Sequence, residues 1–192
     1  MIKASVYIIC KNEEKHIKRV LESVKDFTEI VIVDSGSIDK TLDIAKEFTS
    51  KIFYKEWLGF AAQKEYARSL CTNEWVLNID ADEELTSQLK DEIIQTIDEN
   101  KIDGLNIKIS SQYLGKFNNE KSKFNRRVRF FRKDFGHYPE KLVHESISIN
   151  GKIKNESNEP ITNKYIKFEL STLRDVNIGN KYVKIETLEP EQ

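Results

Sequence analysis

Short apolar runs recur through the first half of the chain and predict β-strands. Four runs are rich in β-branched and aromatic side chains: residues 4–10, 29–34, 51–54 and 75–80. Between and after them the apolar residues change to helical spacing. Strands and helices that alternate in this way predict an α/β fold with a mostly parallel sheet, right-handed crossovers and helices on both faces.

The segments between and after these strands predict amphipathic helices. Their apolar positions fall three or four residues apart, which gives each helix one face suited to the core. The expected buried residues are Ile17, Val20, Leu21 and Val24; Leu42, Ala45 and Phe48; Ala62, Tyr66, Ala67 and Leu70; and Leu89, Ile93, Ile94 and Ile97. The expected N-caps are Asn12 or a neighbour, Ser37, and Thr86.

The pattern changes after Asp103. Leu105, Ile107 and Ile109 alternate as in a strand, and residues 126–132 form another strand-like segment. Residues 146–153 resemble a small hairpin, and residues 175–192 are weakly helical. We therefore expect an α+β C-terminal extension that completes the site of the first half.

Composition and charge narrow the class of protein. A length of 192 residues suits one domain, and a net charge of -1 gives no reason to expect a nucleic-acid partner. Cys10 and Cys71 lie among apolar or small residues, so we expect reduced core thiols in a cytoplasmic protein. We expect a first strand and no signal peptide at the N-terminus, and no apolar run approaches the roughly 20 residues of a membrane helix.

Carboxylates gather where the predicted strands end. Glu13 and Glu14 follow the first strand, Asp34 ends the second, and Asp80 and Asp82 follow the fourth. The carboxyl ends of parallel strands share one edge of the sheet, so these acids should converge on one cleft. Taken singly, each acid could instead be a helix cap or a turn residue. A buried strand has little other use for so many acids, which favours a hard metal ion at residues 80–84.

Three known motifs place acids as residues 80–84 do. An EF-hand calcium loop that starts at Asp80 needs glycine and glutamate where Leu85 and Asp91 stand. Phosphatases of the haloacid dehalogenase type need Thr or Val in place of Glu84, on a strand that usually opens the chain. The Asp-x-Asp motif of sugar transferases accepts these neighbours in mid-chain.

Four motifs in a fixed order make the similarity to sugar transferases specific. Residues 9–14 (ICKNEE), 32–41 (IVDSGSIDKT), 59–64 (GFAAQK) and 78–83 (NIDADE) resemble a family 2 glycosyltransferase of the GT-A fold. More narrowly they are similar to the lipopolysaccharide core β-1,4-glucosyltransferase group. The resemblance implies a Rossmann-like sheet flanked by helices. We expect one domain (1–192) with a nucleotide-sugar-binding half (1–100), an acceptor and catalytic half (101–160) and a C-terminal tail (161–192). The tail would be either a natural terminus or a truncated one.

The resemblance implies that matched residues bind a UDP-sugar. The turn at Asn12, Glu13 and Glu14 would hold the uracil and ribose together with Asp34. Gln63, Lys64 and Asp80 are the further expected nucleotide contacts. Asp80 would touch the ribose or a metal-bound water, whereas Gln63 and Lys64 would lie near the nucleotide and its phosphates. From the residues alone, position 64 would be an exposed helix lysine.

Sugar transfer by this family implies a metal and a base. A Mg²⁺ or Mn²⁺ held by Asp82 would neutralise the charge that grows on the departing diphosphate. Glu145, in a Val-His-Glu segment that matches the resembling group, is the expected base for the acceptor hydroxyl. His144 is a candidate metal ligand or nucleotide contact, or alternatively a packed strand histidine. Attack from the face opposite the leaving group would invert the anomeric carbon.

Residues 126–133 (RRVRFFRK) form a basic segment, with five cations within eight residues. A regular strand would turn Val128 and Phe130 to one face, and Arg127, Arg129 and Phe131 to the other. Arg127 and Arg129 are candidate contacts to acceptor or donor phosphates; the alternative is an edge strand protected by charge. With a lipid-linked acceptor, this patch and the nearby Phe131 and Phe135 would rest peripherally on an anionic membrane.

We therefore expect a cytoplasmic, metal-dependent, inverting glycosyltransferase that moves a sugar, glucose by resemblance, from a UDP-sugar to a bacterial surface saccharide such as lipopolysaccharide core. One rival is a sugar-phosphate nucleotidyltransferase, which normally has a glycine-rich basic loop where this chain reads Lys11-Asn12-Glu13-Glu14. The other is a module of this fold that binds a saccharide or nucleotide without turnover.

Overall fold

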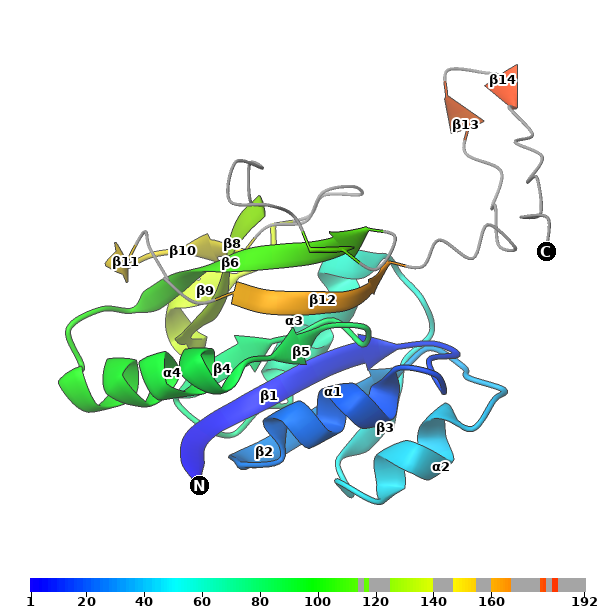
Figure 1. Cartoon of the computed structure of the whole chain (residues 1–192), viewed down its shortest axis with the longest axis horizontal. Coiled ribbons are helices and arrows are strands. Elements are labelled where there is room, and N and C mark those ends of the chain that lie inside the picture. Colours follow the sequence, from blue (N-terminus) through cyan, green and yellow to red (C-terminus); the bar gives the residue numbers. More distant parts are fainter. Residues whose placement is uncertain are drawn as a thin grey trace.

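Four parallel strands form the first half of a central sheet. The computed structural model describes residues 1–113, 116–117, 125–139, 147–154, 160–166, 177–178 and 181–182. The strands are β1 (Ile2–Cys10), β2 (Phe27–Asp34), β3 (Ile52–Tyr54) and β4 (Trp75–Asn78). They lie in the order β3-β2-β1-β4, and all four are parallel. Figure 1 labels these strands within the whole chain. The predicted mostly parallel sheet is confirmed.

The second half of the chain continues the same sheet with strands of both directions. β8 (Asn125–Arg132) lies antiparallel to β4, and β6 (Gly104–Tyr113) lies antiparallel to β8. β12 (Pro160–Ile166) is parallel to β6 and antiparallel to β5 (Glu84–Leu85). The predicted α+β extension is therefore bonded directly to the parallel half through the β4–β8 pair.

Several short strands correct the expectations for the C-terminal part. β7 (Lys116–Phe117) and β11 (Ile153–Lys154) pair with β6, whereas β9 (Gly136–His137) pairs with β10 (Ser148–Ile149). The expected hairpin at residues 146–153 is wrong, because its two arms bond to different strands. The expected weak helix after residue 175 is also wrong in its described part, where β13 (Asn177–Ile178) pairs with β14 (Lys181–Tyr182).

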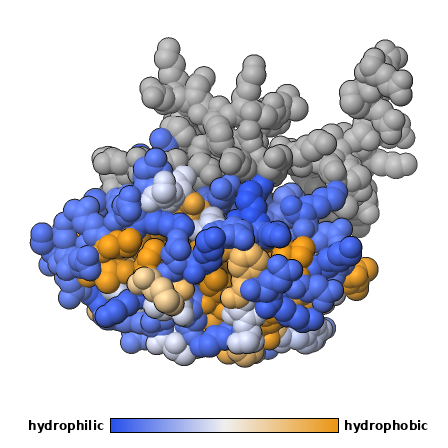
Figure 2. All heavy atoms as spheres, turned by 60° about the horizontal axis from the view of Figure 1, so that its bottom comes forward, coloured by the Kyte–Doolittle hydropathy of each residue, from blue (hydrophilic) through white to orange (hydrophobic). Residues whose placement is uncertain are grey.

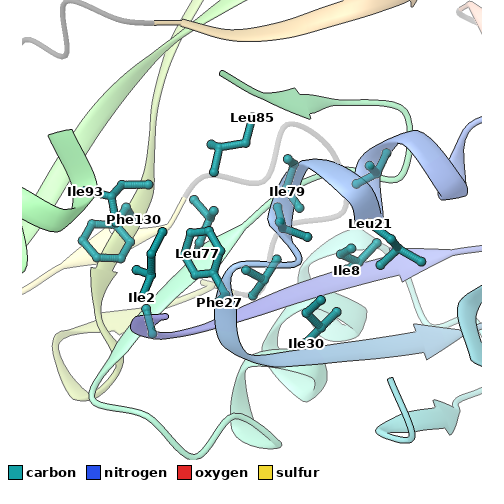
Figure 3. Close-up of a cluster of buried hydrophobic side chains, with 14 of the residues drawn as sticks. Ile2, Ile8, Leu21, Phe27, Ile30, Leu77, Ile79, Leu85, Ile93 and Phe130 are labelled. Atoms are coloured by element: carbon teal, nitrogen blue, oxygen red, sulfur yellow. The ribbon is translucent and has the colours of Figure 1, made fainter. Parts of the chain in front are cut away.

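Helices cover both faces of the sheet, as the sequence predicts. α1 (Ile17–Val24), α2 (Thr41–Lys46) and α4 (Ser87–Glu99) pack on one face, and α3 (Phe60–Ser69) packs on the other (Figure 1). The larger core lies under α1 and α4, where Ile8, Leu21, Leu77, Ile93 and Phe130 meet (Figure 3). Every apolar residue expected on the inner face of α1 is fully buried. Ala62 and Ile94 are instead exposed, because each lies on the outer side of its helix.

The helix N-termini confirm one of three expected caps. The Thr86 hydroxyl accepts a hydrogen bond from the Leu89 N–H at 3.2 Å, which caps α4. α1 begins after His16 and α2 after Lys40, neither with a side-chain cap. Asn12 and Ser37 therefore do not cap these helices; they tie two loops together beside the cleft described below.

The two cysteines lie in the core, and the face drawn in Figure 2 is mostly polar. Cys10 and Cys71 are free and buried, as expected, and burial raises the pKa of the Cys71 thiol to about 12. In the part of the chain that the structure describes, no helix is long and apolar enough to cross a bilayer. The face in Figure 2 is mainly hydrophilic, and hydrophobic residues show on it as separate patches.

Glu29 is a buried carboxylate that ties four segments together near the amino end of β1. The Ser5 hydroxyl and the Lys51 ammonium donate to it, as do the Thr72 N–H at 2.7 Å and the Thr72 hydroxyl at 2.9 Å. Burial opposes ionisation, but these donors outweigh it and lower the pKa of Glu29 to about 2. A carboxyl with a depressed pKa stabilises the fold above its usual pKa of 4.5 and loses that contribution as the pH falls toward 2.

We expect Glu29→Gln to lower the free energy of unfolding by about 2 kcal/mol at pH 7, because charged hydrogen bonds to a buried group are lost. Urea unfolding at a series of pH values measures the difference, which should shrink below pH 4.5. Glu22→Gln is the control, because Glu22 forms an exposed pair with Lys25 and should change stability by less than about 1 kcal/mol. A pH-independent difference for Glu29→Gln would contradict this assignment.

Candidate functional site

A cleft of about 400 Å³ opens where β1 and β4 end. These strands are neighbours in the sheet, and ligands of open α/β sheets bind outside the carboxyl ends of such strands. The residues that line it are Ile9, Cys10, Lys11, Glu13, Trp57, Phe60, Lys64, Asp80, Ala81 and Asp82. The predicted convergence of acids is thus found for Glu13, Asp80 and Asp82.

Asp80 is held between two buried cations. The Arg129 guanidinium donates to both carboxylate oxygens, with Nη2 at 2.9 Å from Oδ2 and Nη1 at 3.3 Å from Oδ1. The Lys64 ammonium lies 2.9 Å from Oδ1. Burial alone would raise the pKa of Asp80, but the charges of Arg129 and Lys64 outweigh it and hold the pKa below its usual value. Asp80 is therefore ionised and fixed in direction.

β8 carries a bulge at Arg129, the residue that bonds to Asp80. In the β6–β8 ladder Leu105 pairs with Phe130 and Asn106 pairs with Val128, so Arg129 has no partner of its own. The bulge makes the expected grouping of Val128 with Phe130 wrong. Val128 and Phe131 pack in one cluster, while Phe130 stacks on Trp75 in the other, with ring centroids 4.8 Å apart. Phe131 is fully buried, so it cannot rest on a membrane surface.

The turn that follows β4 is closed by Glu83. The Asp80 N–H donates to Glu83 Oε2 at 2.8 Å, and the Glu83 N–H donates to the Asp80 carbonyl at 3.0 Å. Arg129 also donates to Glu83 Oε1 at 3.1 Å and to Asn78 Oδ1 at 2.5 Å. Burial raises the pKa of Glu83 to about 7, although Arg129 acts in the opposite direction. One guanidinium thus binds three side chains of the residue 78–83 segment.

Asp82 lies on the cleft wall in a different environment from Asp80. Its carboxylate forms no salt bridge with the residues that the structure describes, and its backbone carbonyl accepts a hydrogen bond from Arg19 at 2.9 Å. Burial, followed by the nearby charges of Asp80 and Glu13, raises the pKa of Asp82. A cation beside Asp82 would relieve this excess of negative charge.

The donor set fits a hard cation that is shared with a ligand. Over the described ranges, no three His, Cys, Asp or Glu side chains form a cluster that could enclose a metal. Mg²⁺ and similar ions are commonly held by one or two carboxylates together with phosphate oxygens of a substrate. Asp82 could supply the protein's share of such a site, with Asp80 fixed beside it.

Asn12 and Glu14 lie in the loop after β1, and Asp34 ends β2, whose following loop bonds to the first beside the cleft. Asn12 takes a φ of +57°, donates its N–H to the Ser37 hydroxyl at 2.8 Å and accepts from the Ile38 N–H at 2.9 Å. The Asp34 carboxylate accepts from the N–H groups of Gly36 and Ser37 at 2.8 and 2.9 Å. None of these residues lines the cleft. They fix the position of Glu13, which does.

Gln63 and Lys64 come from the first turns of α3. Lys64 is buried and lines the cleft, so the expectation of an exposed lysine from the residues alone is wrong. The Gln63 amide donates to the Ser35 hydroxyl at 2.8 Å and to the Lys55 carbonyl at 2.9 Å. Gln63 therefore anchors α3 to the loop after β2, and Lys64 faces the site.

The other predicted site residues fall elsewhere. Glu145 and His144 lie outside the described residues. Arg127 is half-buried in β8, and Arg129 lies beneath the cleft without lining it. The role of each as a phosphate or acceptor contact stays a prediction.

Two aromatic residues of the cleft wall were not predicted from the sequence. Trp57 and Phe60 meet edge to face, with ring centroids 4.7 Å apart, and both are about half exposed. The signal for them was available, because large aromatic residues flank Gly59 just before a predicted helix. Gly59 itself has a φ of +100°, which favours glycine.

Comparison with known proteins finds matches over most of the chain. The family model described as Glycosyl transferase family 2 matches residues 5–155. An uncharacterized glycosyltransferase of Rickettsia typhi is 39% identical over 161 residues, which cover 78% of this chain and 54% of that protein. The lipopolysaccharide core biosynthesis glycosyltransferase LpsC of Rhizobium meliloti is 34% identical over 161 residues, covering 79% of this chain and 59% of LpsC. The chain thus spans a little over half the length of these two relatives.

Solved structures support the fold. S. aureus TarS 1-349 in complex with UDP-GlcNAc superimposes with a TM-score of 0.61 at 20% identity, over 90% of this chain and 62% of that chain. Its complex with UDP gives a TM-score of 0.61 at 21% identity, over 83% and 60% of the two chains. The likeness confirms the expected GT-A architecture.

We expect Arg129→Met to lower the free energy of unfolding by about 3 to 5 kcal/mol, because it leaves buried carboxylates without their fixed cation. Urea unfolding measures the loss. Arg126→Met changes an exposed arginine of the same strand and should alter stability by no more than about 0.5 kcal/mol. Similar losses in the two variants would show that Arg129 does not carry the network.

Proposed function

The chain belongs to glycosyltransferase family 2, and we propose that it binds a UDP-sugar in the cleft between the ends of β1 and β4 and transfers the sugar to a saccharide. One observation carries this proposal: Asp80 is fixed by two buried cations, while Asp82, two residues on, lines the same cleft without a salt bridge in the described part of the chain. Such a pair suits a nucleoside diphosphate and its cation.

Each residue of the cleft has a proposed task. Glu13, held by the loops that contain Asn12, Glu14 and Asp34, would bound the pocket of the uracil and ribose. Asp80 would accept from the ribose or a bound water, and Lys64 would approach the diphosphate; Gln63 would keep α3 in place. Their present hydrogen bonds support this division, because Asp34 and Asp39 accept from backbone N–H groups of these loops, whereas Asp80 and Asp82 line the cleft.

Asp82 is the proposed metal ligand, and His144 is a candidate second one. Mg²⁺ or Mn²⁺ would supply positive charge to the departing diphosphate when bound. The raised pKa of Asp82 supports this role, because Asp80 and Glu13 place negative charge beside it, which a metal ion would offset. Arg129 would keep the Asp80 carboxylate in a fixed orientation by donating to both of its oxygens. Arg127 would contact the acceptor or its phosphates.

Glu145 is the proposed base. It would take the proton of the acceptor hydroxyl as that oxygen attacks the anomeric carbon from the face opposite the diphosphate. The C–O bond to the acceptor then forms as the bond to the diphosphate breaks, and the anomeric carbon inverts. The β4–β8 pair supports this division of labour, because it joins the acceptor half of the chain to the donor cleft.

The proposed acceptor is a bacterial surface saccharide of the lipopolysaccharide core type, and the proposed sugar is glucose. The acceptor assignment is supported by the similarity to LpsC. We place the reaction in the cytoplasm; a lipid-linked acceptor would bring the protein to the inner face of the plasma membrane. The binding module without turnover is distinguished from this proposal by the transfer assay below.

We expect UDP with Mn²⁺, at about 100 times its dissociation constant, to raise the unfolding midpoint by roughly 5 to 10 °C. Asp82→Asn should abolish the part of this shift that depends on Mn²⁺, whereas Asp98→Asn, an exposed change on α4, should preserve it. Thermal unfolding with a panel of nucleotides, each with and without Mn²⁺, makes the measurement. No shift of the wild type with any nucleotide would contradict the proposal.

We expect Glu145→Gln to keep UDP binding and to lose transfer by a factor of about 10² to 10⁴, the usual contribution of a general base. Release of UDP in the presence of a saccharide acceptor measures transfer, and Glu140→Gln is the nearby carboxylate control. Transfer at the wild-type rate in Glu145→Gln would assign the base elsewhere. Absence of transfer in the wild type across donors and acceptors would favour the binding module.

A further inference from the structure

Lys64 keeps a buried ammonium on the wall of the cleft. Its side chain is 5% exposed, and Nζ lies 2.9 Å from Asp80 Oδ1. An ammonium is strongly hydrated, so its burial is costly unless a counter-charge replaces the lost water. A hydrophobic side chain could fill this position of α3 without that cost, so the charge itself serves the site.

The two cations on Asp80 differ in mobility. Arg129 also binds Asn78 and Glu83, so its planar guanidinium is fixed from three directions. Lys64 carries its charge on a flexible four-carbon stem and faces the open cleft. Of the two, Lys64 can change partner without breaking the network beneath the cleft.

Lys64 and a metal ion at Asp82 would oppose each other in an empty cleft. Asp80 and Asp82 line the same pocket, so the ammonium on Asp80 would lie near the metal and repel it. A nucleoside diphosphate removes the conflict, since its phosphate oxygens can accept from the ammonium and also bind the metal. The lysine then has a second partner of higher charge than Asp80.

We propose that Lys64 is a movable counter-cation: it neutralises Asp80 in the empty cleft and transfers to the diphosphate of the nucleotide, so that metal and nucleotide bind cooperatively. This inference rests on the proposed function, because it requires a nucleoside diphosphate in the cleft. By linkage, the metal strengthens nucleotide binding by the same factor as the nucleotide strengthens metal binding. Couplings of about 5- to 150-fold are typical.

Lys64→Met tests the proposal because it removes the charge and keeps an unbranched side chain of similar length. Electron paramagnetic resonance of free Mn²⁺ gives the metal affinity with and without UDP, and calorimetry gives the UDP affinity. We expect Mn²⁺ alone to bind about tenfold more tightly to Lys64→Met than to the wild type, through loss of repulsion. UDP alone should bind about tenfold more weakly, through loss of a charged contact.

Two controls accompany this experiment. Lys90→Met removes a lysine that pairs with Asp26 at the amino end of β1, whereas the cleft lies at the carboxyl end, and it should leave both affinities unchanged. Lys64→Arg retains the charge and should return Mn²⁺ affinity toward that of the wild type. UDP also chelates Mn²⁺ directly, so the coupling is compared between variants; we expect it to be about tenfold smaller in Lys64→Met.

An Mn²⁺ affinity that is unchanged or lower in folded Lys64→Met overturns the inference. If Lys64→Met does not fold, Lys64→Gln replaces it and the same two outcomes decide. The proposed function fails separately: a wild type that binds neither UDP nor UDP with Mn²⁺ rejects the nucleotide site itself. A wild type that binds both, with Lys64→Met unaltered toward Mn²⁺, rejects only the role of Lys64.

Discussion

The site depends on one buried guanidinium at a β-bulge. Arg129 stands in the extension of the sheet, yet its three acceptors, Asn78, Asp80 and Glu83, belong to the end of β4 and the turn after it. A buried cation is costly, and here three well-placed acceptors offset that cost. Leu77 pairs with Phe130 and both lie in the larger core, so the next residues along, Asn78 and Arg129, face the other side of the sheet together. The second half of the chain thereby fixes the acids of the first.

Two carboxylates only two positions apart acquire opposite properties from this arrangement. Asp80 sits between Arg129 and Lys64, which lowers its pKa, whereas the pKa of Asp82 is raised by burial and by neighbouring acids. The cations beside Asp80 outweigh its burial, whereas at Asp82 burial and the neighbouring acids act together to raise the pKa. A single turn thus presents one permanently charged acid as a structural anchor and one acid that would gain from a cation supplied with the ligand.

The sequence was sufficient where structure is determined locally. The face of α1 and the cap of α4 at Thr86 follow from residue spacing within one helix, and the convergence of Asp80 and Asp82 with Glu13 follows from strand order. The bulge at Arg129 could not be predicted in this way, because it depends on the register between β6 and β8. The burial of Lys64 likewise depends on Asp80, sixteen positions later in the chain.

Other errors have the same origin. Residues 146–153 contain turn signals of a hairpin, but β10 pairs with β9 and β11 pairs with β6 instead of with each other. Asn12 and Ser37 are common capping residues, but each bonds across to the other's loop. In every case a short polar or apolar segment had several local solutions, and a tertiary contact selected one that its own sequence does not specify.

The most direct measurement is a crystal structure of the protein with UDP and Mn²⁺, with diffraction recorded at the manganese absorption edge. We predict an anomalous peak within coordination distance of Asp82 and of the UDP phosphates, with Asp80 still bound to Arg129. A peak at Asp80 with the Arg129 contact broken, or UDP bound away from the ends of β1 and β4, would contradict this prediction.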